Sequence, residues 1–456
     1  YYCLVTNFGP TVIYRDNLQT DFRRSTVEAV YNYMLEDLNS AIDKLPRMRP
    51  NQMEHKGAVT AFTAQALAAR IYLLKGDYAQ VETLTDDIIK NGGFRLYDDF
   101  YQLFKIPGKL CDESLFECQV TDYGNGSGDY LGVDQWFNFQ GPNMAERYDE
   151  VVNADGTISY KQAEGTKSIG GWNFIGYEPE FVAWAEARGE GVRAETSFLK
   201  ALSKTREGWQ VGPTSATKTD CWNGKGYLPY NQMTLPRTTY GANNNVRIIR
   251  YAEVLLNYAE AKAELGTLTQ NDLVITVNEI RSRVGMRGLD MNEANKNIDW
   301  YLESKEYGYP NVTGANKGVI LEIRRERAVE LIQEGFRLQD LYRWKAGYCI
   351  DQAISGMYFP GPGEYKLAGK ETADLILYAA GSTKPQGGEG VSVYELGSDI
   401  ILSEGNKGYV YYHKTVENLR TPFNEERDYL YPIPSGERSL NPNLTQNPGW
   451  SDGLDF

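Results

Sequence analysis

Three glutamates spaced four residues apart are the first feature of this chain that could do chemistry. Glu326, Glu330 and Glu334 lie within EIRRERAVELIQEGFRLQDLYRW, residues 322–344. On a helix this spacing would place successive Cβ atoms about 5 to 6 Å apart along one ridge. That separation is close to the roughly 5 Å between the two carboxylates of a retaining glycosidase. A hydrolase with two catalytic carboxylates is therefore one hypothesis.

Arginines interleaved with these glutamates favour a structural role for the ridge. Arg324, Arg325, Arg327 and Arg337 lie beside the acids in the same stretch. Each guanidinium can bind a neighbouring carboxylate through two hydrogen bonds. A general acid needs an apolar setting to stay protonated, whereas a carboxylate flanked by arginine stays ionised. We therefore interpret the ridge as a salt-bridge network that joins a helix to its neighbours, with Gly335 bending or ending that helix.

Other catalytic and metal-binding patterns are weak. The two histidines, His55 and His413, have no metal-ligand spacing, and the chain contains no GxSxG motif. DYGNGSGDY, residues 122–130, is similar to a calcium loop but lacks a glutamate at the twelfth position, so a polar loop is favoured. Five cysteines include no CxxC pair; Cys111 and Cys118 could pair, although free thiols are favoured. We expect no catalytic residue, no metal and no cofactor.

Charge and aromatic content indicate recognition of a ligand other than nucleic acid. The 456 residues contain 47 Lys and Arg against 61 Asp and Glu, a net charge of −14. Nucleic acid and anionic membrane are therefore poor partners for the surface as a whole, while neutral ligands remain open. The chain also has 33 Tyr, and its 45 Gly and 18 Pro imply many loops that can carry rings to the surface.

A tract rich in tryptophan, residues 106–245, is the best candidate for a binding site. It holds five of the eight tryptophans and shows little helical periodicity. Flat rings stack on the apolar faces of pyranose rings, and amide side chains bind the hydroxyls around them. For any single ring, packing in the core remains the alternative. The candidate ligand-binding residues are Trp136, Phe139, Asn143, Trp172, Tyr177, Trp209, Trp222 and Tyr230.

Apolar residues at helical spacing predict the scaffold that must position this tract. A helix is expected from a capping box at Ser25 and Glu28 to Pro46. A helical hairpin is expected from Gly57 to Lys90, with Val59 as its first inward-facing residue, and a similar pair is expected over residues 246–285. Such pairs favour an α-solenoid scaffold with functional insertions. Unrelated helices in separate domains are the alternative.

Two further segments have patterns of their own. Within residues 351–419, the alternating runs VSVYEL and GYVYYHKT could pair with each other as a small β-hairpin. The tail LYPIPSGERSLNPNLTQNPGW has four prolines, so we expect it to run largely extended over the surface. No apolar run is long enough to predict a transmembrane helix.

Six segments of the chain, in their order and spacing, resemble the SusD/RagB family of outer-membrane nutrient-binding lipoproteins of Bacteroidota. The resemblance is carried by YYCLVTNFG at 1–9, KGAVTAFTAQALAARIYLLKGDYAQ at 56–80, RYAEVLLNYAEAKAELG at 250–266, NEIRSRVG at 278–285, ERAVELIQEGFRLQDLYRW at 326–344 and YLYPIPSGERSLNPNLTQNPGW at 429–450. They frame nearly the whole chain, although they cover well under half of its residues.

The resemblance implies one mostly α domain over residues 1–456, with four tetratricopeptide-like helix pairs and minor β-hairpins. The expected scaffold covers about 1–104, 246–347 and the tail 423–456, and the irregular ligand-binding insertions cover about 105–245 and 348–422. Such proteins are non-catalytic, sit on the cell surface of the outer membrane through an N-terminal lipid, and deliver glycans to a SusC-like TonB-dependent transporter. Binding of peptide, as in RagB-like members, is the alternative ligand class.

Departures from the family pattern bear on the loops. The family normally has about a hundred residues and a lipidated cysteine before the motif that begins here at Tyr1, so we expect an N-terminally incomplete chain whose lipid anchor is not Cys3. FGPTVIY alters the usual proline placement, and the stretch between Trp344 and Tyr429 is long for the family. A purely structural partner of the transporter, with the aromatic tract as the protein interface, is a third hypothesis.

Overall fold

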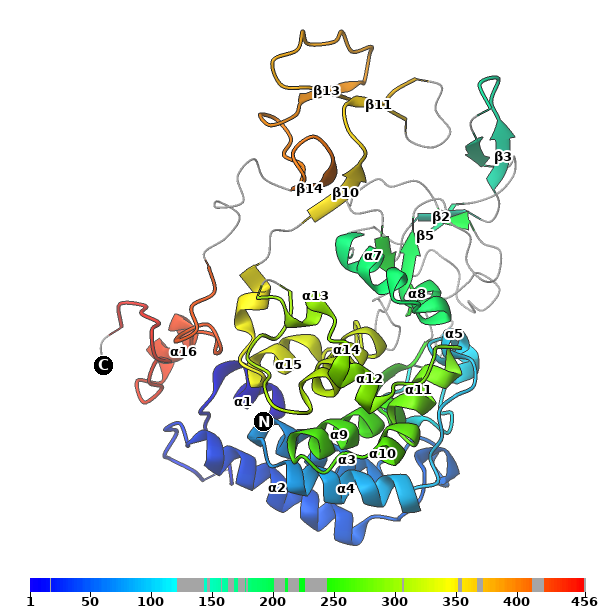
Figure 1. Ribbon diagram of the computed structural model, residues 1–456. Helices are drawn as coiled ribbons and strands as arrows, with labels where there is room; N and C mark the ends of the chain where they lie inside the picture. The colour runs from blue at the N-terminus through cyan, green and yellow to red at the C-terminus, as the bar shows by residue number, and fades with distance from the viewer. Residues whose placement is uncertain are drawn as a thin grey trace, which may run out of the picture.

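The computed structural model describes most of the helical part of the chain and portions of the two insertions (Figure 1). Helices gather in one half of the molecule, and most strands of the insertions lie beyond one end of it. The described residues are 1–16, 18–120, 143–145, 148–156, 158–162, 168–170, 177, 179–200, 210–211, 221–225, 244–305, 307–351, 355–366, 372–411 and 422–454.

The N-terminal helices start the scaffold. They are α1 (Tyr2–Phe8), α2 (Val27–Lys44), α3 (Ala61–Lys75) and α4 (Tyr78–Asn91). Thr60 and Asp77 accept hydrogen bonds from the first turns of α3 and α4, and Gly76 takes the left-handed conformation, φ +72°, in the short turn between them. So short a turn makes α3 and α4 antiparallel neighbours, which confirms the predicted helical hairpin.

Two predicted helix starts are wrong by one or two residues. The cap of α2 is Thr26, whose side chain accepts from the Ala29 amide, and not Ser25. Val59 precedes α3 and is 47% exposed, because a capping box between Thr60 and Thr63 starts that helix at Ala61. Local hydrogen bonding at the cap therefore decides where the helix begins, and the apolar period alone does not.

The second helical segment follows a strand and centres on one buried helix. Its elements are β9 (Val246–Arg250), α9 (Tyr251–Glu264), α10 (Gln270–Val274) and α11 (Val277–Arg283). The predicted second helix is thus broken at Ile275 and Thr276, and residues 246–250 form a strand, which corrects the expected helix start. Leu273, Val277, Ile280 and Val284, which recur at helical spacing in the sequence, are buried.

The remaining scaffold helices complete a stack. They are α12 (Met291–Lys296), α13 (Trp300–Glu303), α14 (Lys317–Glu330) and α15 (Arg337–Arg343). Helices α2, α3, α4, α9 and α14 pack in that order, each against the next, around a core to which α9 and α14 both contribute. Because α9 is enclosed by α4 and α14, polar as well as apolar residues of its sequence are buried. The prediction of a mostly α fold is confirmed.

The first insertion is anchored on the scaffold by a strand pair and two short helices. Strand β1 (Ser114–Cys118) pairs antiparallel with β9. Helices α7 (Pro179–Ala187) and α8 (Gly191–Ser197) lie inside the tract that was expected to be irregular, and Trp184 and Val182 of α7 join the main core. The other described strands of this insertion are short: β2 (Asn143–Ala145), β3 (Tyr148–Val152), β4 (Ile158–Gln162), β5 (Ser168–Gly170), β6 (Phe198–Lys200), β7 (Gln210–Val211) and β8 (Cys221–Asn223).

The second insertion forms a β module, defined by the described residues between 355 and 411. Its strands are β10 (Ser355–Phe359), β11 (Gly363–Tyr365), β12 (Leu375–Tyr378), β13 (Ser392–Glu395) and β14 (Gly408–Tyr411). The predicted hairpin between VSVYEL and GYVYYHKT is wrong, since β13 pairs parallel with β12 and β14 pairs antiparallel with β10. The module has its own small core of Phe359, Leu377, Leu396 and Leu402.

The two ends of the chain meet. The amide of Tyr431 donates to the Asn7 carbonyl at 2.7 Å, and Arg24 donates to the Asn447 side chain at 2.7 Å. The tail is only partly extended, because residues Ser435–Leu440 form α16. Other short elements among the described residues are α5 (Phe100–Leu103) and the 3-10 turns Pro50–Gln52, Ile106–Gly108 and Gly347–Asp351.

Two further findings concern the described residues alone. Among them, no helix has both the length and the apolar character needed to cross a membrane. Cys3, Cys111, Cys118 and Cys349 are free thiols, so the pairing of Cys111 with Cys118 that the sequence left open does not occur.

Candidate functional site

The acidic ridge of the sequence folds into the centre of the protein. Glu326 and Glu330 lie on α14 and have no exposed surface. Glu334 is not on the ridge, because α14 ends at Glu330 and a turn containing Gly335, at φ +87°, leads into α15. The predicted three-residue ridge is therefore wrong in its last member. The turn nevertheless directs the Glu334 carboxylate to the same buried cluster.

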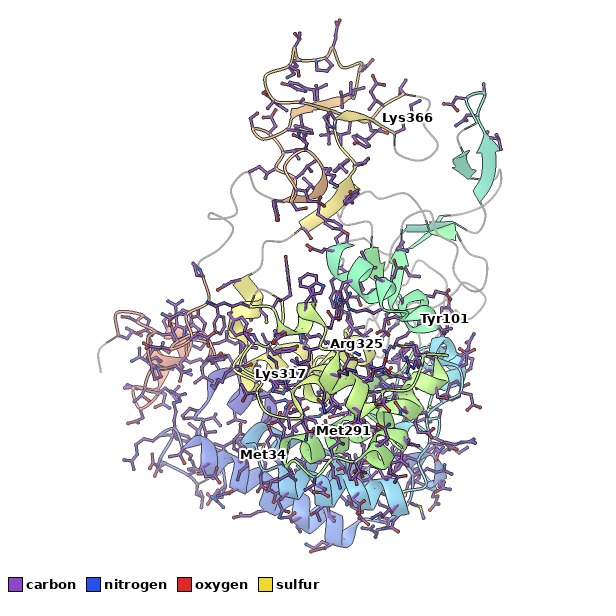
Figure 2. All side chains as sticks on the ribbon, in the orientation of Figure 1. Met34, Tyr101, Met291, Lys317, Arg325 and Lys366 are labelled. Atoms are coloured by element: carbon purple, nitrogen blue, oxygen red, sulfur yellow. The ribbon has the colours of Figure 1, made fainter. Side chains whose placement is uncertain are left out.

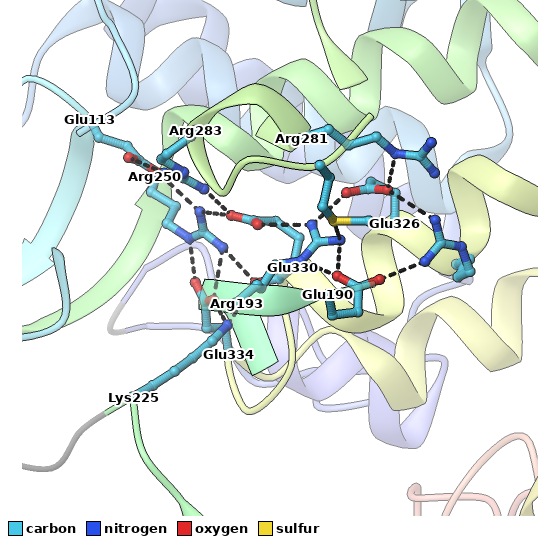
Figure 3. Close-up of polar contacts among 12 residues, drawn as sticks. Glu113, Glu190, Arg193, Lys225, Arg250, Arg281, Arg283, Glu326, Glu330 and Glu334 are labelled. Carbon is cyan, nitrogen blue, oxygen red and sulfur yellow. Dashed lines mark hydrogen bonds and ion pairs between the residues drawn. The ribbon is translucent and has the colours of Figure 1, made fainter. Parts of the chain in front are cut away.

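Arginines from three other segments bind these carboxylates (Figure 3). Arg250 donates to Glu330 at 2.7 Å and to Glu334 at 2.6 Å. Arg283 also binds Glu330. Arg193 bridges the two helical acids, with a contact to Glu326 and one at 3.2 Å to Glu330. Glu326 and Glu330 therefore each have more than one guanidinium partner, while Glu334 binds one guanidinium, that of Arg250, and the ammonium of Lys225.

The whole cluster is electrically balanced. Every acid in it faces at least one cation within ion-pair distance, and the side chains come from α8, α11, α14 and the segments around β1, β8 and β9. Equal numbers of carboxylates and cations take part, so burial leaves no formal net charge. We call this set the ion-pair network; its members are Glu113, Glu190, Glu322, Glu326, Glu330, Glu334, Arg193, Lys225, Arg250, Arg281, Arg283 and Arg325.

Electrostatics keep the network ionised. Burial acts to raise the pKa of Glu326, but Arg193, Arg281 and Arg325 outweigh it and lower that pKa to about 2. The same balance of burial against arginines lowers the pKa of Glu330. A general acid must carry a proton near neutral pH, and these side chains do not. The prediction that this spacing marks a structural salt network is confirmed, and the ridge is unsuited to two-carboxylate hydrolysis.

The network also ties the first insertion to the scaffold. Arg193 on α8 binds Glu326 and Glu330 of α14, and Lys225, just after β8, donates to Glu334 at 2.7 Å and to the Glu330 carbonyl at 2.6 Å. Burial lowers the pKa of Lys225 to about 8, and the neighbouring Glu334 opposes that shift. Parts of the chain more than a hundred residues apart are thus joined at fixed positions.

A second buried cluster holds α9, α14 and α15 together. Arg343 binds Glu260 and donates to Asp340 at 2.7 Å. The indole of Trp344 donates to Glu260 at 2.8 Å, and Arg327 binds Asp340 at 3.1 Å. Burial acts to raise the pKa of Glu260, but Arg343 and Arg327 lower it to about 2. The two clusters include the acids of residues 322–344 and three of its arginines, whereas Arg324 pairs with Glu264 at 3.4 Å and Arg337 donates to the Tyr309 hydroxyl.

Most of the predicted ligand-binding residues lie outside the residues that the structure describes. Trp136, Phe139, Trp172, Trp209 and Tyr230 lie outside the described residues. Asn143 is in β2 and Trp222 is in β8, and their backbone positions alone are described. Tyr177 is described in full.

Tyr177 occupies a core position. It is 7% exposed, and its ring meets the Phe198 ring edge to face with centroids 5.0 Å apart. Burial also raises the pKa of its hydroxyl. Packing, the alternative weighed for each ring, is what the described geometry supports for this one.

An exposed aromatic group that the sequence reading missed lies where α7 meets α13. Trp300 at the start of α13 is 69% exposed, and the next residue, Tyr301, stacks on Trp184 of α7 with ring centroids 4.6 Å apart. The signal was present as the WY pair of NIDWYLES, residues 297–304, which follows the capping aspartate Asp299. This pair lies outside residues 106–245, where the tryptophans are most frequent, so the density of rings along the sequence does not reveal it.

The fold and the site together define a class: a helical-repeat scaffold that carries an inserted, aromatic-rich half fixed by buried ion pairs. The sequence profile of the SusD family matches residues 133–450, and the chain belongs to that family. A SusD-like protein of Bacteroides ovatus is 24% identical over 315 residues, a match that covers 62% of this chain and 50% of the relative. The matched part thus spans about half the length of that curated relative.

Solved structures show the same fold. A SusD-like carbohydrate-binding protein of Bacteroides fragilis has a TM-score of 0.66 at 19% identity, covering 98% of this chain and 77% of its own. Another SusD-like protein of Bacteroides fragilis has a TM-score of 0.63 at 19% identity, covering 99% and 77%. Surface glycan-binding protein A of Bacteroides thetaiotaomicron in complex with laminarihexaose has a TM-score of 0.53 at 22% identity, covering 76% and 67%.

Proposed function

We propose that this protein binds neutral glycans at the cell surface and passes them to a SusC-like TonB-dependent transporter, without catalysing their cleavage. The observation that carries the proposal is the ion-pair network within a SusD-family fold. It fixes the aromatic-rich insertion on the scaffold and holds the ridge carboxylates ionised. Rigid support lowers the entropy lost when a flexible oligosaccharide binds, because the protein side is already ordered.

Charge narrows the ligand class. With a net charge of −14, the protein repels polymers of uronic or sulfated sugars at low ionic strength, while neutral chains feel no such force. Among the structural neighbours, one is described as a laminarin-binding SusD-like protein, with a TM-score of 0.57 at 21% identity over 76% of this chain and 68% of its own. That description supports a glycan as the first ligand class to test.

The family also suggests where the protein works. We propose a lipid-anchored position on the outer surface of the outer membrane and a single SusD-like domain across residues 1–456. Binding of peptide in the RagB-like manner is the second candidate, since the fold admits it. Pulling a transporter out of membranes with the tagged full-length protein, and losing it when the tagged protein lacks the lipidation site, would test the location and the partner together.

Ligand class can be tested directly. Affinity electrophoresis and calorimetry against laminarin, mixed-linkage β-glucan, amylopectin, mannan and a peptide pool should show micromolar or weaker binding to at least one polysaccharide. Chromatography of the same mixtures after prolonged incubation should show no new oligosaccharide. Retention of peptide alone would favour the RagB-like alternative, and release of product would establish a hydrolase.

The aromatic candidates of the first insertion can be tested in the same assay. Single changes of Trp136, Trp172 and Trp222 to Ala should weaken glycan binding at one or two of the three positions, since a stacked ring contributes about 1 kcal/mol or more. If all three variants bind glycan as well as the unmodified protein, the binding site does not lie in this tract, although the proposed ligand class is unaffected.

A further inference from the structure

The most exposed aromatic side chain among the described residues stands on a rigid base. Trp300 is 69% exposed, whereas the other described rings with large exposure do not pass 48%. Its edge meets Tyr301, with centroids 5.8 Å apart and an interplanar angle of 80°. A large apolar ring held in solvent loses the stabilisation that burial would bring, so its retention at such a site points to a partner that covers it.

The base beneath Trp300 is a stack of rings. Tyr301 lies between Trp184, at 4.6 Å and 25°, and Tyr307, at 4.9 Å and 3°. Phe181 extends the stack behind Trp184 at 5.7 Å. Trp184 itself is 8% exposed and belongs to the main core, so the stack is continuous with the scaffold. Tyr301, the neighbour of Trp300 in α13, is therefore fixed in position before any ligand binds.

An ion pair between Arg188 and Asp299 lies beside the ring stack. Arg188 donates to both carboxylate oxygens of Asp299, with one contact at 2.8 Å, and its guanidinium lies 4.6 Å from the Trp184 ring centre. Asp299 also accepts from the Tyr301 amide at 3.0 Å and so caps α13. The charges next to Trp300 therefore cancel each other. This ion pair therefore adds no net charge that would attract a charged ligand or oppose a neutral one.

The position of this group suits a site at the edge of the insertion. Figure 1 shows α13 at the end of the helical half that faces the insertions, with α7 next to it. The contact between Trp184 of α7 and Tyr301 of α13 joins a residue of the first insertion to the scaffold. Lys317, labelled in Figure 2, binds Glu303 at the other end of α13 and completes the local charge pairing.

We propose that Trp300 is a stacking platform for a pyranose ring of a neutral glycan chain. This inference rests on the proposed function and adds a binding position outside residues 106–245. The exposed indole covers the C–H face of one sugar, the ring stack holds the neighbouring Tyr301 against the scaffold, and the Arg188–Asp299 pair adds no net charge beside the contact. A single ring contact gives weak affinity, which suits a surface that holds a long chain at several points.

Three variants test the platform. Trp300→Ala removes the ring, Trp300→Phe keeps a smaller one, and Tyr358→Ala removes an exposed ring, 48% exposed, on the β module. With the polysaccharide that the unmodified protein binds in the panel above, Trp300→Ala should weaken binding about fivefold to tenfold. Trp300→Phe and Tyr358→Ala should stay within about twofold. Because Trp300 is exposed, its loss should leave the melting temperature unchanged, which separates binding from folding.

Fluorescence provides a readout specific to this ring. Acrylamide should quench Trp300 in the free protein, and saturating polysaccharide should protect it; the total protection of tryptophan fluorescence should therefore be smaller in Trp300→Phe than in the unmodified protein. If the unmodified protein binds a polysaccharide while Trp300→Ala binds it equally well and Trp300→Phe keeps the full protection from acrylamide, the platform is wrong and the proposed function stands. If no polysaccharide binds and a peptide or the transporter protects Trp300 instead, both the proposed function and the glycan platform are wrong.

Discussion

Arg250 and Glu330 form an ion pair at 2.7 Å, although 80 residues separate them and their side chains are 2% and 0% exposed. Arg250 ends β9, and Glu330 ends α14. Removing two charges from water costs several kcal/mol per ion, and that cost is offset only where hydrogen bonds satisfy both partners. Here Glu113, Arg283 and Glu334 also bind members of the pair, so several contacts together offset the desolvation free energy.

Glu330→Gln should destabilise the protein without abolishing binding. The amide keeps the shape of the side chain but leaves Arg250, Arg283 and Arg193 facing one buried negative charge fewer. Removing one partner of a buried pair costs about 3 to 5 kcal/mol. We expect a loss of that size in the free energy of unfolding by urea titration, with glycan affinity within about twofold of the unmodified protein.

An exposed ion pair provides the control for Glu330→Gln. Glu293 binds Arg287 at 2.7 Å, but their side chains are 48% and 79% exposed. Glu293→Gln should therefore change stability by less than about 1 kcal/mol. Equal effects of the two substitutions on stability would contradict a buried network. A stable Glu330→Gln variant that no longer binds glycan would show that the Glu330 carboxylate belongs to the binding site.

Acid should unfold this protein at a pH set by the buried glutamates. Arginines lower the pKa of Glu326 and Glu260 to about 2, from an ordinary 4.5. Below about pH 4.5 the unfolded chain takes up protons that the folded protein does not, so stability is present above that pH and is lost as the pH falls toward 2. Each such carboxylate removes about 1.4 kcal/mol per pH unit in this window. Urea titrations at pH 7, 5, 4 and 3 measure the loss; a flat profile would contradict it.

Much of the scaffold could be predicted because its signals are local. Gly76 and Asp77 mark helix ends by their own backbone or side chain, and the apolar period agrees with the buried residues of α11, although it did not reveal the Thr60 cap of α3. Strand pairing is different, since β12 and β13 pair through a crossover and β1 pairs with β9 from a distant part of the chain. Nothing in the local alternation of a strand specifies its partner.

The candidate site was likewise predictable in its local features and not in its tertiary contacts. The sequence predicted that Arg and Glu would pair, because the two types alternate in one segment. It could not predict that the partners of Glu330 would be Arg250, Arg283 and Arg193, since these contacts exist only after the helices stack. Tyr177 was chosen for its ring type, and its burial depends on the Phe198 ring that folding brings beside it. Exposure of a ring, as at Trp300, is likewise a tertiary property.

Arg193→Met should loosen the attachment of the first insertion. The side chain is fully buried and binds Glu190, Glu326 and Glu330, so its removal leaves acids of two elements facing each other. Hydrogen exchange followed by mass spectrometry should show faster exchange in residues 191–200 than in the unmodified protein. Exchange in α3, residues 61–75, should stay slow, because α3 has no side chain in the ion-pair network.

Lys200→Met is the matched control for Arg193→Met, because Lys200 lies in the same segment and its pair with Glu186 is exposed at the surface. It should leave exchange in residues 191–200 unchanged. Faster exchange across α3 and residues 191–200 alike in Arg193→Met would mean that the network supports the whole fold and not the attachment of the insertion.

Leu377→Ala should damage the β module and spare the scaffold. Leu377 is 1% exposed and packs with Phe359, Leu396 and Leu402 in a core separate from that of the helices. Loss of a buried leucine costs about 2 to 5 kcal/mol where the cavity does not close. Because that cost falls on a separate core, hydrogen exchange should accelerate in residues 372–411 while the main unfolding transition stays in place. Tyr394→Ala, at a ring 39% exposed on β13, is the control and should change neither. A fall in the main transition with Leu377→Ala would show that the module and the scaffold unfold as one unit.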